Sequence, residues 1–269
     1  MTRISVVIPS WNDAEMLANC LAALARQERP ADEIIVVDNG STDATAAIAA
    51  ASGARVVAEP LRGTLPATAA GFDAARFPVI ARLDADSVPP PDWLARIERT
   101  METRPGIAAV TGSGDFYGAG AAVRWLGRNV YLGGYFTVIG ALLGHPPLFG
   151  SNFALRSSAW QRLRGRVHRT VREVHDDFDL SFALRPDMAV LYDPELRVQI
   201  SARPFDSLSG LWRRIRWAYL TLRLNTAEQS ARQRRAERRS WQRQGAQGAT
   251  RHDPGDDPGT EPDGLIART

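Results

Sequence analysis

The chain has 269 residues, of which 44% are hydrophobic and 23% charged, and its formal net charge is +3. These values indicate an ordinary globular protein that forms one large domain or one domain plus appendages. The single cysteine, Cys20, excludes an internal disulfide and a thiolate metal cluster, and we expect it to be a buried, inert thiol. The small net charge argues against nucleic-acid binding.

The N-terminal sequence shows no secretory signal pattern. Its apolar run, Ile4 to Ile8, is shorter than the apolar core of a signal peptide and is ended by Pro9. We therefore expect a cytoplasmic location.

The first half of the chain alternates β-branched apolar runs with helical patterns. The expected strands are residues 4–9, 33–38, 55–58 and 78–83, and the expected helices are residues 15–26, 44–51 and 67–75. This alternation predicts an α/β fold with a mostly parallel sheet covered by helices on both faces. Ligands of such sheets bind beyond the carboxyl ends of the strands, so Asp38 and Asp84 are expected to face one site.

Asp84-Ala85-Asp86 follows the fourth of these strands and places two carboxylates one residue apart. Such hard oxygen ligands suit Mg²⁺ or Mn²⁺, which complete their coordination with water and substrate phosphates. Taken alone, the same residues are also typical of a polar turn.

The second half is less regular. Residues 106–111 predict another strand, and Gly112, Gly114, Gly118 and Gly120 are expected to interrupt regular structure after it. Residues 129–155 are uncharged and mostly apolar, with residues 130–144 the densest part. Because a membrane-spanning helix needs about 20 apolar residues, that part predicts a buried or interfacial helix instead.

The C-terminal region is rich in arginine. Between residues 203 and 243 there are eleven Arg against three acidic residues, and residues 232–241 predict a solvated basic helix. Residues 245–269 are rich in Gly, Pro and Asp and predict a disordered tail.

Several motifs together resemble glycosyltransferase family 2, whose members are inverting, nucleotide-sugar-dependent enzymes with a GT-A fold. The resemblance covers roughly residues 4–222. The matching segments are the first strand and loop (residues 4–12), Val36 to Asp43, Asp84-Ala85-Asp86 in place of the DxD motif, Phe149 to Leu155, His175 to Leu180, and Arg213 to Trp217. In the last two segments Asp176 replaces the usual Glu and Arg213 replaces the usual Gln. The family's Arg-Asn pair after the third strand is also missing, since Thr68-Ala69 stands there.

The resemblance implies roles for particular residues. Those assigned to the nucleotide-sugar donor are Pro9, Ser10, Asn12, Asp38, Arg82, Asp84, Asp86 and Arg216, with Asp86 and Asp84 also assigned to a Mn²⁺ or Mg²⁺ ion. For Arg82, a surface strand arginine is an equal alternative. Those assigned to the acceptor side are Gly150, Ser151, Asn152, Asp176 and Trp217. Asp177 falls at the position of the catalytic base, which takes a proton from the acceptor hydroxyl. His175 stays open between a metal ligand and a hydrogen-bonded loop residue.

The resemblance further implies a division of the chain. Residues 1–225 are expected to form the GT-A domain, with a nucleotide-sugar-binding half (1–111) and an acceptor and catalytic half (112–225). A basic helical extension (226–244) and the tail (245–269) complete the chain. The apolar segment and the arginines leave open a lipid-linked or cell-envelope acceptor and a peripheral location on the inner face of a membrane.

Other functions fit the sequence less well. A sugar nucleotidyltransferase would need a Gly-rich basic loop after the first strand, where Pro9 to Asp13 stand instead. No GxGxxG comes after any predicted strand, which argues against a dehydrogenase. A catalytically silent sugar-nucleotide-binding scaffold remains an alternative, although the retained acidic residues argue against it.

Overall fold

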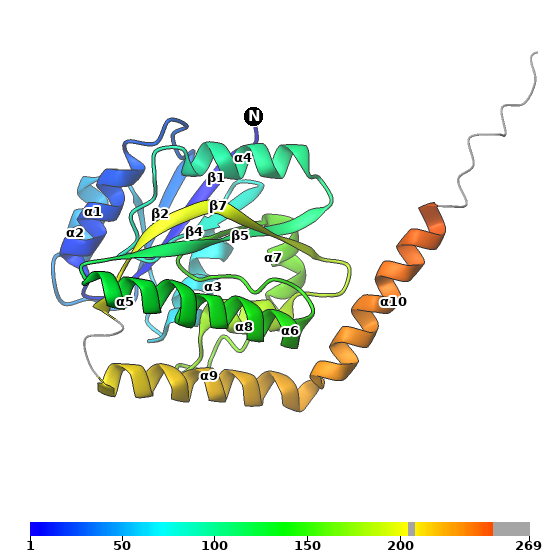
Figure 1. The fold of residues 1–269 in the computed structure, drawn as a ribbon. Helices are drawn as coiled ribbons and strands as arrows, with labels where there is room; N and C mark the ends of the chain where they lie inside the picture. Colours follow the sequence, from blue (N-terminus) through cyan, green and yellow to red (C-terminus); the bar gives the residue numbers. More distant parts are fainter. Residues whose placement is uncertain (204–207, 250–269) are drawn as a thin grey trace, which may run out of the picture.

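The computed structural model describes residues 1–203 and 208–249 and builds them around one seven-stranded sheet (Figure 1). The strands are β1 (Ile4–Ser10), β2 (Glu33–Asp38), β3 (Arg55–Ala58), β4 (Val79–Arg82), β5 (Ile107–Tyr117), β6 (Phe153–Arg156) and β7 (Ala189–Ser201). Their order in the sheet is β3-β2-β1-β4-β6-β5-β7. β6 is antiparallel to both of its neighbours, and the other pairs are parallel. The predicted mostly parallel α/β sheet is confirmed.

Helices cover the two faces of this sheet. The α-helices are α1 (Ala14–Leu24), α2 (Thr45–Ala51), α3 (Thr64–Ala74), α4 (Trp93–Thr103), α5 (Ala121–Leu126), α6 (Gly140–Leu143), α7 (Ser157–Leu163), α8 (Asp176–Ala183), α9 (Leu208–Glu228) and α10 (Ala231–Ala249). Two π-helical stretches, η1 (Gly127–Leu132) and η2 (Tyr135–Ile139), lie between α5 and α6.

The core has two layers because successive strand side chains point to opposite faces. Val6 of β1 packs in the same cluster as Leu17 of α1 and Trp93 of α4. Val7, its neighbour, packs in the other cluster with Phe72 of α3 and Trp160 of α7. Both faces are therefore apolar, as the continuous β-branched runs predicted. Cys20 is fully buried in the first layer, and burial raises the pKa of its thiol far above the ordinary range.

β5 corrects one expectation, because Gly112 and Gly114 lie inside this strand. A Cβ atom on Gly112 would come within 1.8 Å of the Leu196 carbonyl oxygen, and one on Gly114 within 2.9 Å of Ile200. Both residues belong to β7, the partner strand. These glycines therefore allow two strands to pack closely, instead of interrupting the chain.

The 121–143 helix, as we call the run of α5, η1, residues 133–134, η2 and α6, is longer than the predicted segment. Leu132 and Leu143 are buried on it, whereas Val130 and Val138 are exposed. In Figure 1 it runs below the sheet, above α9. Across the residues that the structure describes, no helix is both long enough and apolar enough to span a bilayer.

The predicted basic helix forms as α10, but it is not simply solvated. Arg238 is buried and donates hydrogen bonds to the carbonyl oxygens of Met188, Arg185 and Leu184, while Arg234 lies over the ring of Phe182. α10 continues to Ala249, which corrects the expected start of a disordered tail at residue 245. The rest of that predicted tail, residues 250–269, lies outside the described residues.

Candidate active site

A cavity of about 720 Å³ opens beyond the carboxyl ends of β1 and β4 and extends to α8 and α9. We call it the donor-side cavity. Eleven residues singled out from the sequence line it: Pro9, Ser10, Arg82, Asp84, Asp86, Gly150, Ser151, His175, Asp176, Asp177 and Trp217. Four others, Asn12, Asp38, Asn152 and Arg216, are not among its lining residues. The strand-end rule therefore located the cavity, and most of the expected residues meet there.

Arg82 connects two carboxylates in this cavity. Its side chain is 1% exposed, which excludes the surface alternative, and its Nη1 lies 2.7 Å from Asp84 Oδ1. Its Nη2 donates a 2.9 Å hydrogen bond to Asp176 Oδ2. Thr68 Oγ1 donates a second hydrogen bond to that oxygen, at 2.7 Å. A buried guanidinium thus neutralises both acids and holds Asp84 at the cavity wall.

Asp86 is paired with an arginine that the sequence did not single out. Arg203 Nη2 lies 3.0 Å from Asp86 Oδ2, and Arg203 Nη1 lies 2.7 Å from Asp13 Oδ1. Burial, and then the nearby charge of Asp84, raise the pKa of Asp86 to about 6. The environment of Asp86 therefore favours a nearby positive charge, which the Arg203 guanidinium supplies in this structure.

Asp177 lies in the first turn of α8, next to Asp176, and lines the cavity. Its Oδ2 accepts a 2.8 Å hydrogen bond from the Gly150 backbone N–H, and its Oδ1 accepts one from the Phe178 N–H. Burial, and then the adjacent Asp176, raise the pKa of Asp177. A positioned carboxylate with a raised pKa is suited to accept a proton near neutral pH.

Two consecutive residues, Gly150 and Ser151, connect Asp177 with Asp84. Ser151 Oγ donates a 2.5 Å hydrogen bond to Asp84 Oδ2, while the neighbouring Gly150 N–H binds Asp177. A Cβ atom at residue 150 would lie 2.8 Å from Arg82 Nη1 and 3.0 Å from Asp177 Oδ2. Only glycine leaves room for this approach of backbone to charged side chains.

Asn12 and Asp38 organise loops next to the cavity. Asp38 Oδ1 accepts a hydrogen bond from the Ser41 N–H, and Asn12 Oδ1 accepts one from the Thr42 N–H. The cavity itself is reached by their neighbours Trp11 and Asn39.

Asn152 and Arg216 are directed elsewhere. Asn152 is fully buried, donates to the carbonyl oxygens of Ser113 and Leu196, and accepts from Trp93 Nε1. Arg216 is exposed and pairs with Glu173. In its place Arg213 and Arg214, slightly earlier on α9, line the cavity.

His175 joins the start of α8 to α9. Its Nε2 lies 3.0 Å from the Arg214 carbonyl oxygen, and its ring packs edge-on against Trp217 with the centroids 6.0 Å apart. A carbonyl oxygen is only an acceptor, so Nε2 carries the proton in this contact, and the structure shows the hydrogen-bonded role.

Sequence reasoning missed Arg203, Thr68 and Arg62. Arg62 lies over the Trp11 ring, 3.8 Å from its centroid, at the cavity wall. Only the departure at Thr68-Ala69 from the family pattern was a signal, since Thr68 now holds Asp176.

The lining has features of a polar-ligand site. Among the described residues on its wall, Ser10 Oγ, Trp217 Nε1 and Arg82 Nε are buried without a hydrogen-bond partner. Asp84 and Asp86 offer hard oxygen atoms to a divalent cation, but no three His, Cys, Asp or Glu side chains in residues 1–203 and 208–249 gather to hold one unaided. These acids fit a Mg²⁺ or Mn²⁺ ion whose coordination is completed by ligand phosphates.

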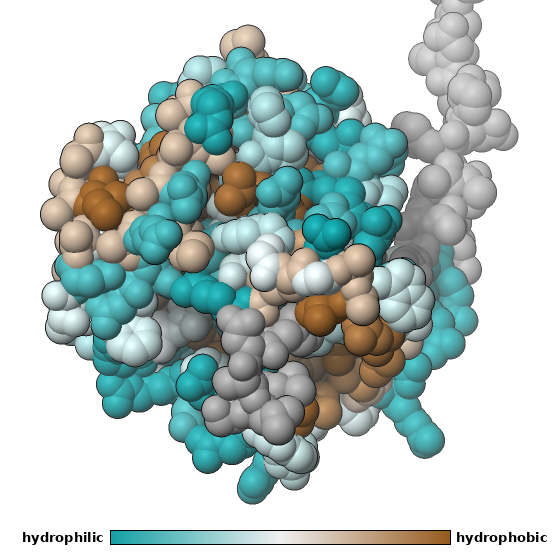
Figure 2. Space-filling view, turned by 60° about the vertical axis from the view of Figure 1, so that its left-hand side comes forward, coloured by the Kyte–Doolittle hydropathy of each residue, from teal (hydrophilic) through white to brown (hydrophobic). Residues whose placement is uncertain are grey.

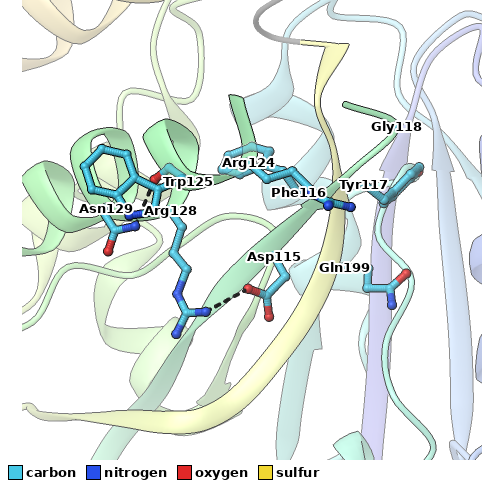
Figure 3. A pocket seen from close by; sticks show the side chains of 9 residues that line it. All are labelled: Asp115, Phe116, Tyr117, Gly118, Arg124, Trp125, Arg128, Asn129 and Gln199. Atoms are coloured by element: carbon cyan, nitrogen blue, oxygen red, sulfur yellow. Dashed lines mark hydrogen bonds and ion pairs between the residues drawn. The ribbon is translucent and has the colours of Figure 1, made fainter. Parts of the chain in front are cut away.

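A separate cavity of about 750 Å³ lies beside α5 and β5 and shares no lining residue with the donor-side cavity (Figure 3). Its one lining acid, Asp115, pairs with Arg197 at 2.6 Å and more loosely with Arg128. Because this cavity has one lining acid, whereas the donor-side cavity brings together Asp84, Asp86 and Asp177, the chemistry is better placed in the donor-side cavity.

Solved structures with a similar fold come from Mycobacterium tuberculosis. Glucosyl-3-phosphoglycerate synthase in complex with Mn²⁺, uridine diphosphate and phosphoglyceric acid superposes with a TM-score of 0.60, at 24% identity, covering 83% of this chain and 78% of that one. A complex of the same enzyme with Mg²⁺ and uridine diphosphate gives 0.59, at 23% identity, covering 83% and 79%.

Curated relatives match a shorter stretch. An uncharacterized glycosyltransferase of M. tuberculosis is 46% identical over 83 residues, which are 31% of this chain and 36% of that protein. An undecaprenyl-phosphate 4-deoxy-4-formamido-L-arabinose transferase of Pseudomonas fluorescens is 38% identical over 104 residues, 35% of this chain and 30% of that protein. The chain thus matches about a third of each relative's length.

The family comparison covers more of the chain than the curated relatives do. The sequence profile of Glycosyl transferase family 2 matches residues 5–163, which include β1 to β6 and the Asp84-Ala85-Asp86 segment. With the fold and the acidic cavity, this match shows that the chain belongs to glycosyltransferase family 2.

Proposed function

We propose that the protein is a metal-dependent, inverting glycosyltransferase that moves a sugar from a nucleoside-diphosphate donor to a hydroxyl acceptor. The observation that carries this proposal is that Asp84 and Asp177 line the same cavity. Two adjacent residues hold them there by hydrogen bonds, Ser151 for Asp84 and Gly150 for Asp177. One acid is placed for the donor and the other for the acceptor.

In this proposal the donor lies between the strand ends and α9. Asp84 and Asp86 hold a Mn²⁺ or Mg²⁺ ion, which when bound neutralises the developing charge of the departing diphosphate. Arg213 and Arg214, in place of Arg216, add guanidinium donors from α9. Ser10, Trp11 and Asn39 face the nucleoside, while Asn12 and Asp38 fix their loops. The Mn²⁺, Mg²⁺ and uridine diphosphate in the similar structures support this choice of ligand.

Asp177 acts as the base. The acceptor oxygen forms a bond to the anomeric carbon while the bond from that carbon to the diphosphate oxygen breaks, and the electron pair leaves with the diphosphate. The acceptor proton moves to the Asp177 carboxylate, which the Gly150 and Phe178 N–H groups orient. A single displacement inverts the configuration.

The direct test measures turnover of a panel of nucleotide sugars with Mn²⁺ or Mg²⁺, for the wild type and the Asp86→Ala and Asp177→Asn variants. We expect turnover that depends on the metal and is lost in both variants. Wild-type turnover that survives both changes would refute the site assignment, and nucleotide binding without any turnover would favour a silent scaffold.

We also propose peripheral contact with an anionic membrane surface, as for an enzyme of cell-envelope glycans. Support comes from exposed aromatic side chains, Trp125, Trp212 and Tyr219, on α5 and α9, together with the arginines of α9. Sedimentation with anionic vesicles should be lost at high salt. A protein that stays in the supernatant at low salt would exclude this contact.

A further inference from the structure

A cavity of about 710 Å³ runs between the 121–143 helix and α9. We call it the apolar groove. Most of its lining is hydrocarbon, including Leu126, Val130 and Val138 from the helix, Phe178 from α8, and Ile215 and Ala218 from α9. Such a lining offers almost nothing to hydrogen-bond a sugar or a nucleotide, so its occupant must present an apolar surface.

The apolar groove opens into the donor-side cavity. The two share Tyr131, Phe149, His175, Asp177 and Arg214 in their walls. His175, Asp177 and Arg214 are also the ionisable groups, apart from the tyrosines, that line the groove. The groove is therefore polar at one end, where the proposed base lies, and apolar along the rest.

The groove is open to the surface. Val130 is 58% exposed, Val138 64% and Ile215 49%, although all three are large apolar residues. Figure 2 shows brown, apolar surface gathered in its lower right part. Contiguous exposed apolar surface of this kind marks a binding site more often than a free surface.

We propose that the apolar groove binds the hydrocarbon chain of an amphiphilic acceptor, and that the head group of this acceptor presents its hydroxyl to Asp177. This inference rests on the proposed function, whose acceptor class it names. The polarity of the groove sets the orientation of the acceptor. When the hydrocarbon lies between the helices, the polar head group lies at the residues that the groove shares with the donor-side cavity. Continuity with the donor-side cavity then brings the hydroxyl to the anomeric carbon.

Direct binding tests the groove without any turnover. Alkyl glucosides with chains of increasing length, kept below their micelle concentrations, are titrated into the full chain by calorimetry. We expect the dissociation constant to fall by roughly fourfold for each added methylene until the groove is filled. A dissociation constant independent of chain length would overturn the inference.

Two neighbouring glycines provide a matched pair of variants. Gly134 lines the groove, and a Cβ atom there meets nothing within 4 Å. Gly133 is outside the lining, and its added Cβ meets only ordinary contact at 3.7 Å. Gly134→Leu should fill the groove and abolish the chain-length dependence, whereas Gly133→Leu should keep it. Because both remove a helical glycine, neither should melt below the wild type. Equal effects of the two variants on binding would contradict a groove-specific site.

The results separate this inference from the function on which it rests. Chain-length-dependent binding that Gly134→Leu abolishes, with no sugar transfer, would keep the groove and refute the proposed function. Transfer to short polar acceptors as fast as to long-chain ones would keep the function and refute the groove. A wild-type dimer that Gly134→Leu dissociates in analytical ultracentrifugation would assign the groove to a second copy and also refute the inference.

Discussion

The donor-side cavity and the apolar groove meet at Asp177 but are built differently. The cavity is fixed by strand ends and buried charges, with Arg82 held between Asp84 and Asp176. The groove is formed by the surfaces of two helices, and its lining side chains are partly exposed. On the proposed function, geometry at the reacting centre would be set by interlocked ion pairs, whereas recognition of the acceptor would depend on surface that can change with little cost to the fold.

The largest expected effect is at the boundary between the two regions. Asp177→Asn removes the proposed base, and we expect the turnover number to fall by about 10²- to 10⁴-fold. Affinity for a nucleoside diphosphate should change little, because the Asp84 side of the cavity keeps its partners. Steady-state kinetics and equilibrium nucleotide binding measure both. A turnover number within tenfold of the wild type would remove Asp177 from the mechanism.

A second change tests whether the cavity is as rigid as its ion pairs suggest. Gly150→Ala places a Cβ atom against Arg82 and Asp177, so we expect a turnover loss of about 10²-fold and a loss of about 1–3 kcal/mol in the free energy of unfolding. Gly165→Ala, where an added Cβ meets nothing within 4 Å, is the control for a generic glycine effect. Equal behaviour of the two variants would show that the loop adapts.

The third prediction concerns pH. Because burial and Asp176 raise the pKa of Asp177, its basic form is lost at a higher pH than for an ordinary carboxyl. The rate should fall about tenfold per pH unit below that pKa. A pKa that is higher in the folded than in the unfolded protein also means that ionised Asp177 destabilises the fold. Its contribution to the free energy of unfolding is therefore largest at low pH and is lost as pH rises through the raised pKa. Profiles of kcat/KM against pH check this. An acid limb below pH 4 would contradict it.

The smallest expected effect is at Arg203. Arg203→Ala frees Asp86 from a half-exposed ion pair, so we expect Mn²⁺ to bind a few-fold more tightly without nucleotide, as measured by calorimetry. Arg197→Ala, which breaks the Asp115 pair elsewhere, serves as the control. Unchanged Mn²⁺ affinity in Arg203→Ala would mean that the guanidinium does not compete with the cation.

Much of the first half could be predicted from the sequence because its signals are local. Glu33 to Asp38 and Arg55 to Ala58 form strands with the expected bounds, since β-branched runs ended by turn residues have few alternatives. Arg82, Asp84 and Asp177 could be predicted to line the cavity because each belongs to a motif that can be read within a short segment.

The remaining features depend on long-range packing. Arg203 meets Asp86 across 117 residues of sequence, and no local pattern predicts such a pair. Gly112 looks like a turn residue until the approach of β7 is known. Arg216 and Trp217 are adjacent on α9, where neighbouring residues project about 100° apart, and the structure directs Trp217 to the cavity and Arg216 to Glu173. The motif alone could not say that Trp217 would be the one to line the cavity.

The Gly150-Ser151 peptide has a consequence for the order of events. Ser151 holds Asp84, which is on the donor side, and Gly150 holds Asp177, which is on the acceptor side. A metal-bound donor that takes over the Asp84 oxygen bound by Ser151 would act one residue away from the N–H that orients Asp177. We therefore expect the order of binding to matter, because a nucleotide sugar that binds first can influence the proposed proton acceptor through this peptide before the acceptor arrives.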